Sequence, residues 1–308
     1  MSIEEVCRLV GKSRQAYYQL EKRRTRQYIG DEMVLVYVRG IRVREPRMGT
    51  RKLHWLLKAV MKDNGIKMGR DKFFALLHAH SLLVKSCRKR VRTTDSNHGY
   101  GKYPNLIKEY EPCGPEQIWS SDITYVSTEK GFVYVSLVTD LYSKKIMGYH
   151  VHETLKAEGP LEALRMALKN RSHPETRLIH HSDRGIQYRS GEYGELLKRN
   201  GIQISISAPG NPYENAVSER VNGTIKTEFC LDGYFRNIEQ VRKAVKEAVF
   251  LYNNHRPHAS CDYLTPEQAH HRHGQLKIRW RNYPSKIQPQ IIDEDTQKAL
   301  EQLLVKVQ

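Results

Sequence analysis

Three acidic residues stand at positions where a carboxylate could do chemistry. Asp122 lies inside an apolar run typical of a β-strand, Asp183 ends a second such run at a Gly-containing turn, and Glu219 begins a helix after a Gly- and Pro-containing loop. A charge inside a strand is costly unless it is paired or binds a cation, although the solvent face of an edge strand would also tolerate Asp122. If the three side chains converge, they form an all-oxygen site that suits Mg²⁺ or Mn²⁺ rather than zinc. Two such ions about 3.5 to 4 Å apart can assist an in-line phosphoryl displacement.

The stretch from Ser207 to Lys226 combines that loop with the helix that carries Glu219. Lys226 follows Glu219 by seven residues, about two helical turns, so an acid and a base share one face with Asn215 and Asn222 close by. Such a face could hold a cation and a phosphate together. Taken alone, the pattern also fits an ordinary ion pair on a solvated surface.

The periodicity of the apolar residues predicts the elements that must position these acids. Strands are predicted over residues 117–127, 132–140, 145–151, 176–183 and 202–206, and helices over residues 159–170, 190–200, 215–229 and 238–254. Three strands with short connections form a meander, and the later strands alternate with helices. This order predicts an α/β fold in which a mixed five-stranded sheet is flanked by helices on both faces.

An all-α region precedes the predicted sheet. Residues 2–22 have the pattern of two short helices around a turn at Gly11, with Ser13 as the N-cap of the second. This is the pattern of a helix-turn-helix segment, which binds DNA, and also of any other αα-hairpin. Further helices are predicted over residues 33–43, 50–62 and 70–83, with their apolar side chains forming a core.

The charge of the chain indicates a polyanionic partner. The 308 residues include 51 Lys and Arg against 34 Asp and Glu, which gives a formal net charge of +17. The basic residues Arg88, Lys89, Arg90 and Arg92 follow the helical region and are suited to contacting phosphates, although a solvated tether has the same composition. No apolar run is long enough to span a bilayer and no secretory signal opens the chain, so nucleic acid is favoured over a membrane.

The five cysteines are scattered and include no Cys-x-x-Cys pair. A reducing compartment is therefore expected. His78, His80, Cys87 and Cys113 do not follow the usual spacing of a zinc site.

The motifs around the three acids resemble those of a known enzyme family. Asp122 stands in Trp-x-x-Asp-Ile-Thr, Asp183 in His-Ser-Asp-Arg-Gly-x-Gln-Tyr and Glu219 in Gly-Asn-Pro-Tyr-Glu-Asn-Ala-x-x-Glu, with 60 residues between the first two acids and 35 between the last two. Downstream, Tyr252-Asn-Asn-His-Arg-Pro-His258 and Leu264-Thr-Pro266 match as well. Together these motifs resemble the DDE(35) core of the insertion-sequence transposases closest to retroviral integrases, a family whose transposase is usually made from two overlapping reading frames.

The resemblance implies a ribonuclease-H-like fold in which Asp122, Asp183 and Glu219 cluster at strand ends and hold two divalent ions, Mg²⁺ or Mn²⁺. It implies DNA 3′-end cleavage followed by strand transfer, in which the exposed 3′-hydroxyl attacks a second phosphodiester without a covalent protein intermediate. The expected enzyme is a DDE transposase, a polynucleotidyl transferase for DNA transposition and integration. A DNA-binding regulator derived from an inactive transposase and a ribonuclease-H-like nuclease are the alternatives.

The resemblance also implies roles for further residues. Those expected to contact DNA or to shape the site are Lys226, Asn215, Gln187, Tyr188, Arg256 and His258. A cation such as Arg256 could equally satisfy the carbonyl end of a helix. His180 and His181 are expected to be structural residues rather than bases.

These patterns divide the chain into five segments. They are a helix-turn-helix-like segment at 1–30, a helical DNA-binding domain at 31–92, a linker at 93–112, a ribonuclease-H-like integrase core at 113–274 and a C-terminal tail at 275–308. The implied partners are double-stranded DNA at the element ends and at the target, further copies of the chain on DNA, and the upstream-frame product of the same element. The implied location is the bacterial cytoplasm, in association with the nucleoid.

Overall fold

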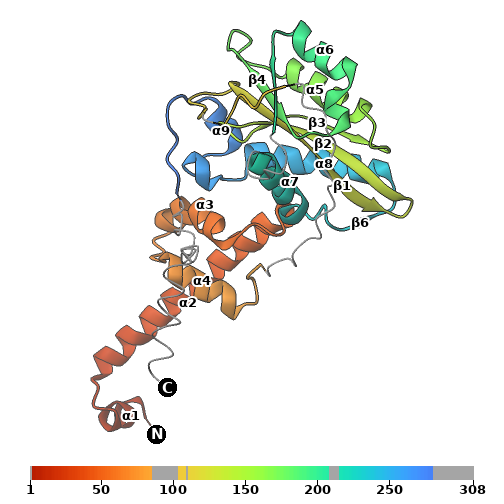
Figure 1. Cartoon of the computed structure of the whole chain (residues 1–308). Helices are drawn as coiled ribbons and strands as arrows, with labels where there is room; N and C mark the ends of the chain where they lie inside the picture. The colour runs from red at the N-terminus through yellow and green to blue at the C-terminus, as the bar shows by residue number, and fades with distance from the viewer. Residues whose placement is uncertain (1, 85–102, 109, 208–214, 280–308) are drawn as a thin grey trace, which may run out of the picture.

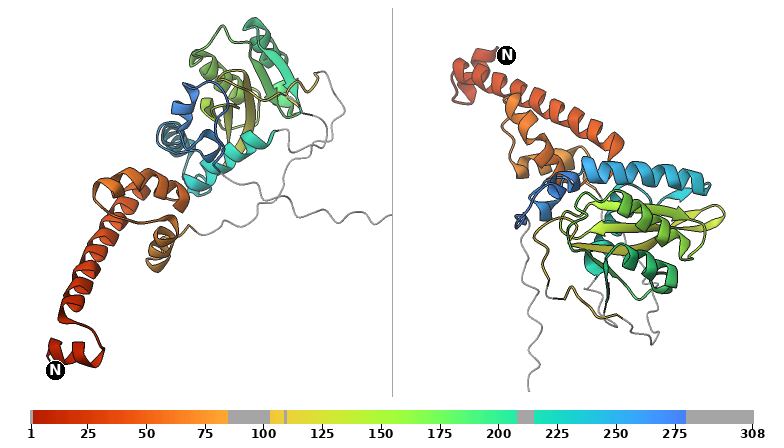
Figure 2. Two further views of the ribbon diagram at one scale, coloured as in Figure 1. Left: turned by 90° about the vertical axis from the view of Figure 1, so that its left-hand side faces the viewer. Right: turned by 90° about the horizontal axis from the view of Figure 1, so that it is seen from above.

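The computed structural model describes residues 2–84, 103–108, 110–207 and 215–279. An α/β body contacts a smaller helical region, and one long helix of that region projects away from the body (Figure 1). The two further views in Figure 2 show α1 at the far end of this helix, well separated from the sheet. No helix of the described residues is both long enough and apolar enough to cross a bilayer.

Four helices make up the helical region. They are α1 (Ile3–Leu9), α2 (Arg14–Arg44), α3 (Thr50–Asp63) and α4 (Arg70–Ala79). Ser13 caps α2 as predicted, by accepting a hydrogen bond from the backbone N–H of Ala16. The inner half of α2 packs on α3 and α4 through a core that includes Leu35, Leu53 and Phe73.

The separate helices predicted over residues 13–22 and 33–43 are wrong, because α2 is a single helix of 31 residues. Gly30 is the weakest helix former in the stretch between them. It is buried, and a Cβ there would meet the side chain of Ile66 at an ordinary 3.5 Å, so the helix continues through a position that is packed in the core. The predicted division at residues 30 and 31 falls inside this helix.

The α/β body contains the predicted mixed sheet. Its strands are β1 (Ile118–Thr128), β2 (Gly131–Asp140), β3 (Ile146–His152), β4 (Ile179–Ser182) and β5 (Gln203–Ile206), in the spatial order β3-β2-β1-β4-β5. The first three strands form the antiparallel meander, and β4 and β5 add to β1 in parallel. A two-residue strand that the sequence did not predict, β6 (Tyr234–Phe235), pairs with the far end of β1.

Helices cover both faces of the sheet, as predicted. The helices of the body are α5 (Glu158–Lys169), α6 (Gly191–Arg199), α7 (Ala216–Glu228), α8 (Ile238–Asn254) and α9 (Pro266–His270). One core joins the sheet to α7 and α8 through residues such as Val221, Ile225 and Val245, and the other joins it to α5 and α6 through Leu164 and Leu197. Burial of two such apolar layers is the main stabilising contribution to this body.

A buried polar network fastens α9, which the sequence did not predict, to the sheet. The carboxylate of Glu116 accepts hydrogen bonds from the backbone N–H groups of Ser172 and His173, and Nε2 of His270 lies 3.2 Å from it. Asp140 at the end of β2 accepts the backbone N–H of Glu116 at 2.7 Å. Glu116, Asp140 and His270 are all fully buried, so these bonds replace the water that each group loses.

A close contact between β3 and α5 allows a direct test of the packing. A Cβ added to Gly148 in β3 would lie 2.0 Å from the carbonyl oxygen of Ala163 and 2.6 Å from the backbone nitrogen of Ala167, both in α5. Because α5 would have to move, we expect Gly148→Ala to lower the free energy of unfolding by about 3 kcal/mol or more, measured by urea denaturation.

The matched control is Gly194→Ala in α6. A Cβ there meets its nearest neighbour at an ordinary 3.9 Å. Higher helix propensity should therefore raise the free energy of unfolding by about 0.5–1 kcal/mol. Equal midpoints for the two variants would contradict the packing described between β3 and α5.

Candidate active site

The pairing of β1 with β4 determines where two of the three acids lie. The strands run in parallel with Ser121 opposite Ser182, so the next residues along, Asp122 and Asp183, are at the same level of the sheet. Successive side chains of a strand point to opposite faces, and the matched register therefore directs these two carboxylates to the same side.

Asp122 is held by two hydrogen bonds. Its Oδ1 accepts the backbone N–H of Ile123 at 2.9 Å, and its Oδ2 accepts Nδ2 of Asn222 in α7 at 2.7 Å. Burial raises the pKa of Asp122 to about 7, with the charge of Asp183 as the next cause and that of Glu219 as a smaller one. The ionised form of Asp122 is therefore disfavoured at this position.

Asp183 lies in a turn that is closed by the backbone of Gly185. Its Oδ1 accepts the backbone N–H of Gly185 at 2.9 Å, and a Cβ on Gly185 would lie 3.0 Å from the same oxygen. Burial raises the pKa of Asp183, and the bond from Gly185 opposes this shift. The turn thus fixes the carboxylate beside Asp122 while leaving it poorly solvated.

Glu219 lies in the first turn of α7 and is exposed. Its charge acts on Asp122, but no three His, Cys, Asp or Glu side chains of the described residues lie close enough together to hold a metal ion. The structure thus brings Asp122 and Asp183 together, and it leaves Glu219 within electrostatic reach but outside a closed cluster. Residues 208–214, which contain the predicted Gly/Pro loop, lie outside the described part of the chain.

The chemistry of these groups fits a hard divalent cation. All three offer carboxylate oxygens, the ligands that Mg²⁺ and Mn²⁺ prefer. The raised pKa of Asp122 arises from burial and from two neighbouring acids, and a bound cation would reverse the effect of both.

A hydrogen-bonded cluster beneath the acids was not predicted from the sequence. Nε2 of His180 lies 2.7 Å from Oγ of Ser121 and 2.9 Å from the hydroxyl of Tyr193. Burial lowers the pKa of His180 to about 3, so its ring is neutral at physiological pH. Its burial agrees with the structural role expected for it. Two small polar residues in a strand interior, Ser120 and Ser121, were the available signal.

Three of the residues expected to shape the site are buried around it. Oδ1 of Asn215 accepts a hydrogen bond from Oγ of Ser120 at 2.6 Å. Nε2 of Gln187 donates a hydrogen bond to the carbonyl oxygen of Leu155 at 2.9 Å. The hydroxyl of Tyr188 is buried and has no hydrogen-bond partner among the described residues. Burial, followed by the charges of Tyr193, Asp122 and Asp183, raises the pKa of Tyr188 well above its usual value. Tyr188 therefore lies close enough to both aspartates for their charges to act on it.

The cations expected to contact DNA lie in other environments. Lys226 is only 7% exposed, and its Nζ lies 4.1 Å from the centroid of the Tyr125 ring. Arg256 is 5% exposed and binds Glu228. His258 is half-buried, with Nδ1 2.8 Å from Oγ of Ser260, and burial followed by the charge of Arg256 lowers its pKa. The predicted basic residues Arg88, Lys89, Arg90 and Arg92 lie outside the described residues.

Known proteins match this chain over the region just described. Two models of an integrase core domain match residues 113–212 and 200–266. The chain is 34% identical over 276 residues to the insertion element IS600 uncharacterized 31 kDa protein of Shigella sonnei, a match that covers 88% of this chain and 99% of that protein. It is 32% identical over 278 residues to the transposase InsF for insertion sequence IS3A of Escherichia coli strain K12, covering 87% of this chain and 93% of the relative.

Among solved structures, the HTLV-2 integrase catalytic core domain in complex with magnesium is similar at 20% sequence identity and a TM-score of 0.42. This match covers 52% of this chain and all of that one.

The sheet order, the helices on both faces and the matched core domain define an enzyme of the integrase-like polynucleotidyl transferase class, with a ribonuclease-H-like core. The chain belongs to the insertion-sequence transposases of the retroviral-integrase-like family. The resemblance predicted from the motifs is thereby confirmed.

The crowding of Asp122 predicts a dependence of stability on pH. Its folded-state pKa of about 7 lies above its ordinary value of 3.8, so the destabilisation is fully present above pH 7 and is lost as the pH falls toward 4. In EDTA we therefore expect Asp122→Asn to raise the free energy of unfolding at pH 8 by on the order of 2 kcal/mol.

Urea denaturation at pH 8 and pH 5 measures this difference, with the exposed Glu192→Gln in α6 as the control. The Asn222 amide can turn over in this variant, so that its Oδ1 accepts from the new amide in place of the bond that Nδ2 donates to the carboxylate. A gain of the same size at both pH values would show that the carboxylate of Asp122 is not crowded.

Proposed function

We propose that the chain is a DDE transposase that cleaves DNA at the 3′ end of an insertion sequence and transfers the new end to a second DNA. Asp122, Asp183 and Glu219 would hold two divalent ions, Mg²⁺ or Mn²⁺. The observation that carries this proposal is the matched register of Asp122 and Asp183 on neighbouring parallel strands of an integrase core domain.

The residues around the acids support distinct roles. Asn222 and the backbone of Ile123 orient Asp122, and the Gly185 turn orients Asp183, so both carboxylates face one place without rearrangement. Divalent cations bound there would polarise a phosphodiester and stabilise the developing charge of an in-line displacement. Glu219 would complete the ligand set from the exposed first turn of α7, once DNA and metal are bound.

The charge of the whole chain supports DNA as the substrate. A formal net charge of +17 favours binding to phosphates of any sequence. In this proposal residues 1–30 and 31–92 bind the element end, 93–112 link them to the catalytic core of 113–274, and 275–308 form a tail. The chain would act in the bacterial cytoplasm as a homo-oligomer on DNA, together with the upstream-frame product. Lys226 and His258 would contact DNA only if the site opens, because both are shielded here.

The first test replaces each acid conservatively. Asp122→Asn, Asp183→Asn and Glu219→Gln should each reduce Mg²⁺-dependent cleavage and joining of end-containing DNA by at least about 10³-fold, because each removes a ligand of the reacting centre. DNA affinity, measured by fluorescence anisotropy, should stay within about twofold. The exposed Glu247→Gln in α8 is the control and should keep full activity. Strand transfer by any of the three variants would refute the assignment.

The second test concerns the basic residues 88–92. Replacing Arg88, Lys89 and Arg90 together by Gln should reduce the slope of log affinity against log salt by about 2 to 3, since each lost phosphate contact removes about 0.9. The control replaces three exposed cations at the ends of α5 and α6, which are Lys169, Lys198 and Arg199. An unchanged slope in the first variant would show that this run is a solvated tether.

A further inference from the structure

The carboxyl end of α7 is held by an ionic cluster between the helical region and the α/β body. Glu228, the last residue of α7, accepts two hydrogen bonds from Arg256, at 2.7 Å from Nε and 2.9 Å from Nη2. Its Oε1 also accepts Nζ of Lys52 in α3 at 2.6 Å. One cation of this cluster therefore comes from the body and the other from the helical region.

An arginine of the helical region, Arg47, contacts the same end of α7 through both its backbone and its side chain. The N–H of Arg47 donates to the carbonyl of Glu228 at 3.3 Å, and its guanidinium donates to the carbonyl of Thr227 at 3.3 Å. The guanidinium also binds both carboxylate oxygens of Asp232, at 2.8 and 2.9 Å. The last carbonyls of a helix lack partners within the helix. Arg47 supplies hydrogen-bond donors to two of them, those of Thr227 and Glu228.

The cluster is ionised and largely shielded from water. Burial disfavours the charge of Glu228, but the bonds and charges of Arg256 and Lys52 hold its pKa at about 2. A second acid, Glu45, is also buried, and burial raises its pKa to about 7. Charge-assisted and bidentate bonds of this kind restrict geometry more than neutral bonds do.

We propose that Arg47, Lys52 and Arg256 are positioning residues that set the placement of α7, and through it the placement of Glu219 and Asn222 against Asp122. The proposal rests on the transposase function proposed above. Glu219 and Glu228 belong to one uninterrupted helix and are about 14 Å apart along its axis. A helix of this length moves as a rigid unit, so fixing one end fixes the direction of the other.

The arrangement assigns Arg256 a role that differs from DNA contact. With 5% of its surface exposed and two bonds to Glu228, its guanidinium cannot meet a phosphate without breaking the cluster. It also makes α3 part of the support of the catalytic centre. A helical region that bound DNA could then alter the position of α7 directly.

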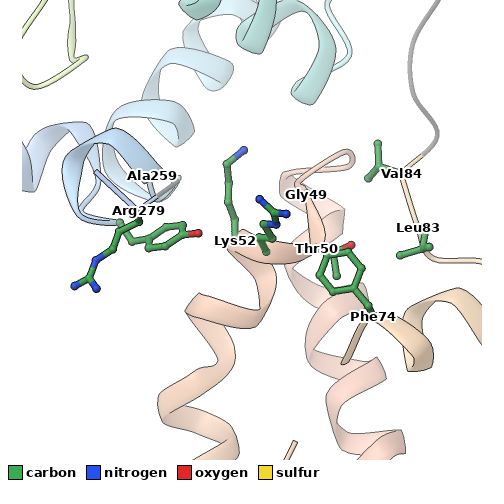
Figure 3. Close-up of a pocket in the computed structure, with 10 residues that line it drawn as sticks. Gly49, Thr50, Lys52, Phe74, Leu83, Val84, Ala259 and Arg279 are labelled. Carbon is green, nitrogen blue, oxygen red and sulfur yellow. The ribbon is translucent and has the colours of Figure 1, made fainter. Parts of the chain in front are cut away.

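Lys52 is the residue of choice for a test. Glu228 keeps its bidentate bond to Arg256 when Lys52 is removed, so Lys52→Met leaves no buried charge without a partner. A cavity of about 390 Å³ adjoins Lys52, lined also by Thr50, Phe74 and Tyr263. Figure 3 shows the Lys52 side chain extending from α3 away from Phe74. Lys52→Arg keeps the positive charge that pairs with Glu228.

The experiment compares full-length wild type, Lys52→Met, Lys52→Arg and the control Lys62→Met, an exposed position on the same helix. Hydrogen exchange of residues 216–228 should become about tenfold faster in Lys52→Met, because one charged hydrogen bond to the end of α7 is lost. Exchange in Lys52→Arg and Lys62→Met should stay within about twofold of wild type.

Strand transfer by the same proteins completes the test. Turnover should fall about tenfold in Lys52→Met and recover in Lys52→Arg, while the Kd for end-containing DNA stays within about twofold. Unchanged exchange in α7, unchanged turnover, or a loss of affinity equal to the loss of turnover would each overturn the proposal. If wild type joins no DNA, the proposed function fails, and exchange in α7 still decides whether the cluster holds this helix.

Discussion

The repulsion between two carboxylates placed side by side in a sheet is the constraint on which the rest of this structure depends. Asp122 and Asp183 meet because β1 and β4 are parallel and in register, and a parallel pair requires a crossover connection. That connection runs through β2, β3 and helix α5, and Gly148 lets the backbone of α5 approach β3 closely. Packing far from the acids thus maintains an arrangement that the acids themselves oppose. Such conflict between stability and local chemistry is typical of functional sites.

The sequence predicted most of the sheet and the helices around it, because the alternation of apolar residues in strands and their helical period elsewhere are strong local signals. It failed where local signals are weak or misleading. The apolar pattern divided residues 13–43 into two helices where the chain forms one, and β6 has only two residues, too few to show a period. Helix α9 has five residues, and the buried contacts of His270 with Glu116 join positions that are 154 residues apart. No periodicity encodes pairings over such distances.

The candidate site likewise has residues that local sequence signals identify and residues whose roles depend on distant contacts. Motif and spacing identified Asp122, Asp183 and Glu219 in the sequence. The register of β1 and β4 explains why the first two lie side by side. The residues that support these acids are harder to predict, because their contacts join different helices and strands. The contact of Asn222 with Asp122 follows from helical spacing, since Asn222 lies one turn after Glu219, whereas the bond of Glu228 to Lys52 joins α7 to a helix formed 176 residues earlier. Arg256 stands in a recognisable motif and was expected to contact DNA, to shape the site or to satisfy a helix end, and the structure places it against the carboxylate of Glu228.

Helix α2 gives the helical region an unusual mechanical property. Its 31 residues span about 46 Å; the inner half packs against α3 and α4 through Val34, Leu35 and Val38, whereas the outer end contacts the short helix α1. The turn that leads from this half into α3 contains Arg47, which contacts α7. The helix is consequently a lever whose pivot adjoins the support of the third acid, with α1 at the opposite end of the arm (Figure 2). A tilt of a few degrees at the pivot moves α1 by several ångströms, so a load applied at α1 acts on the end of α7 with mechanical advantage.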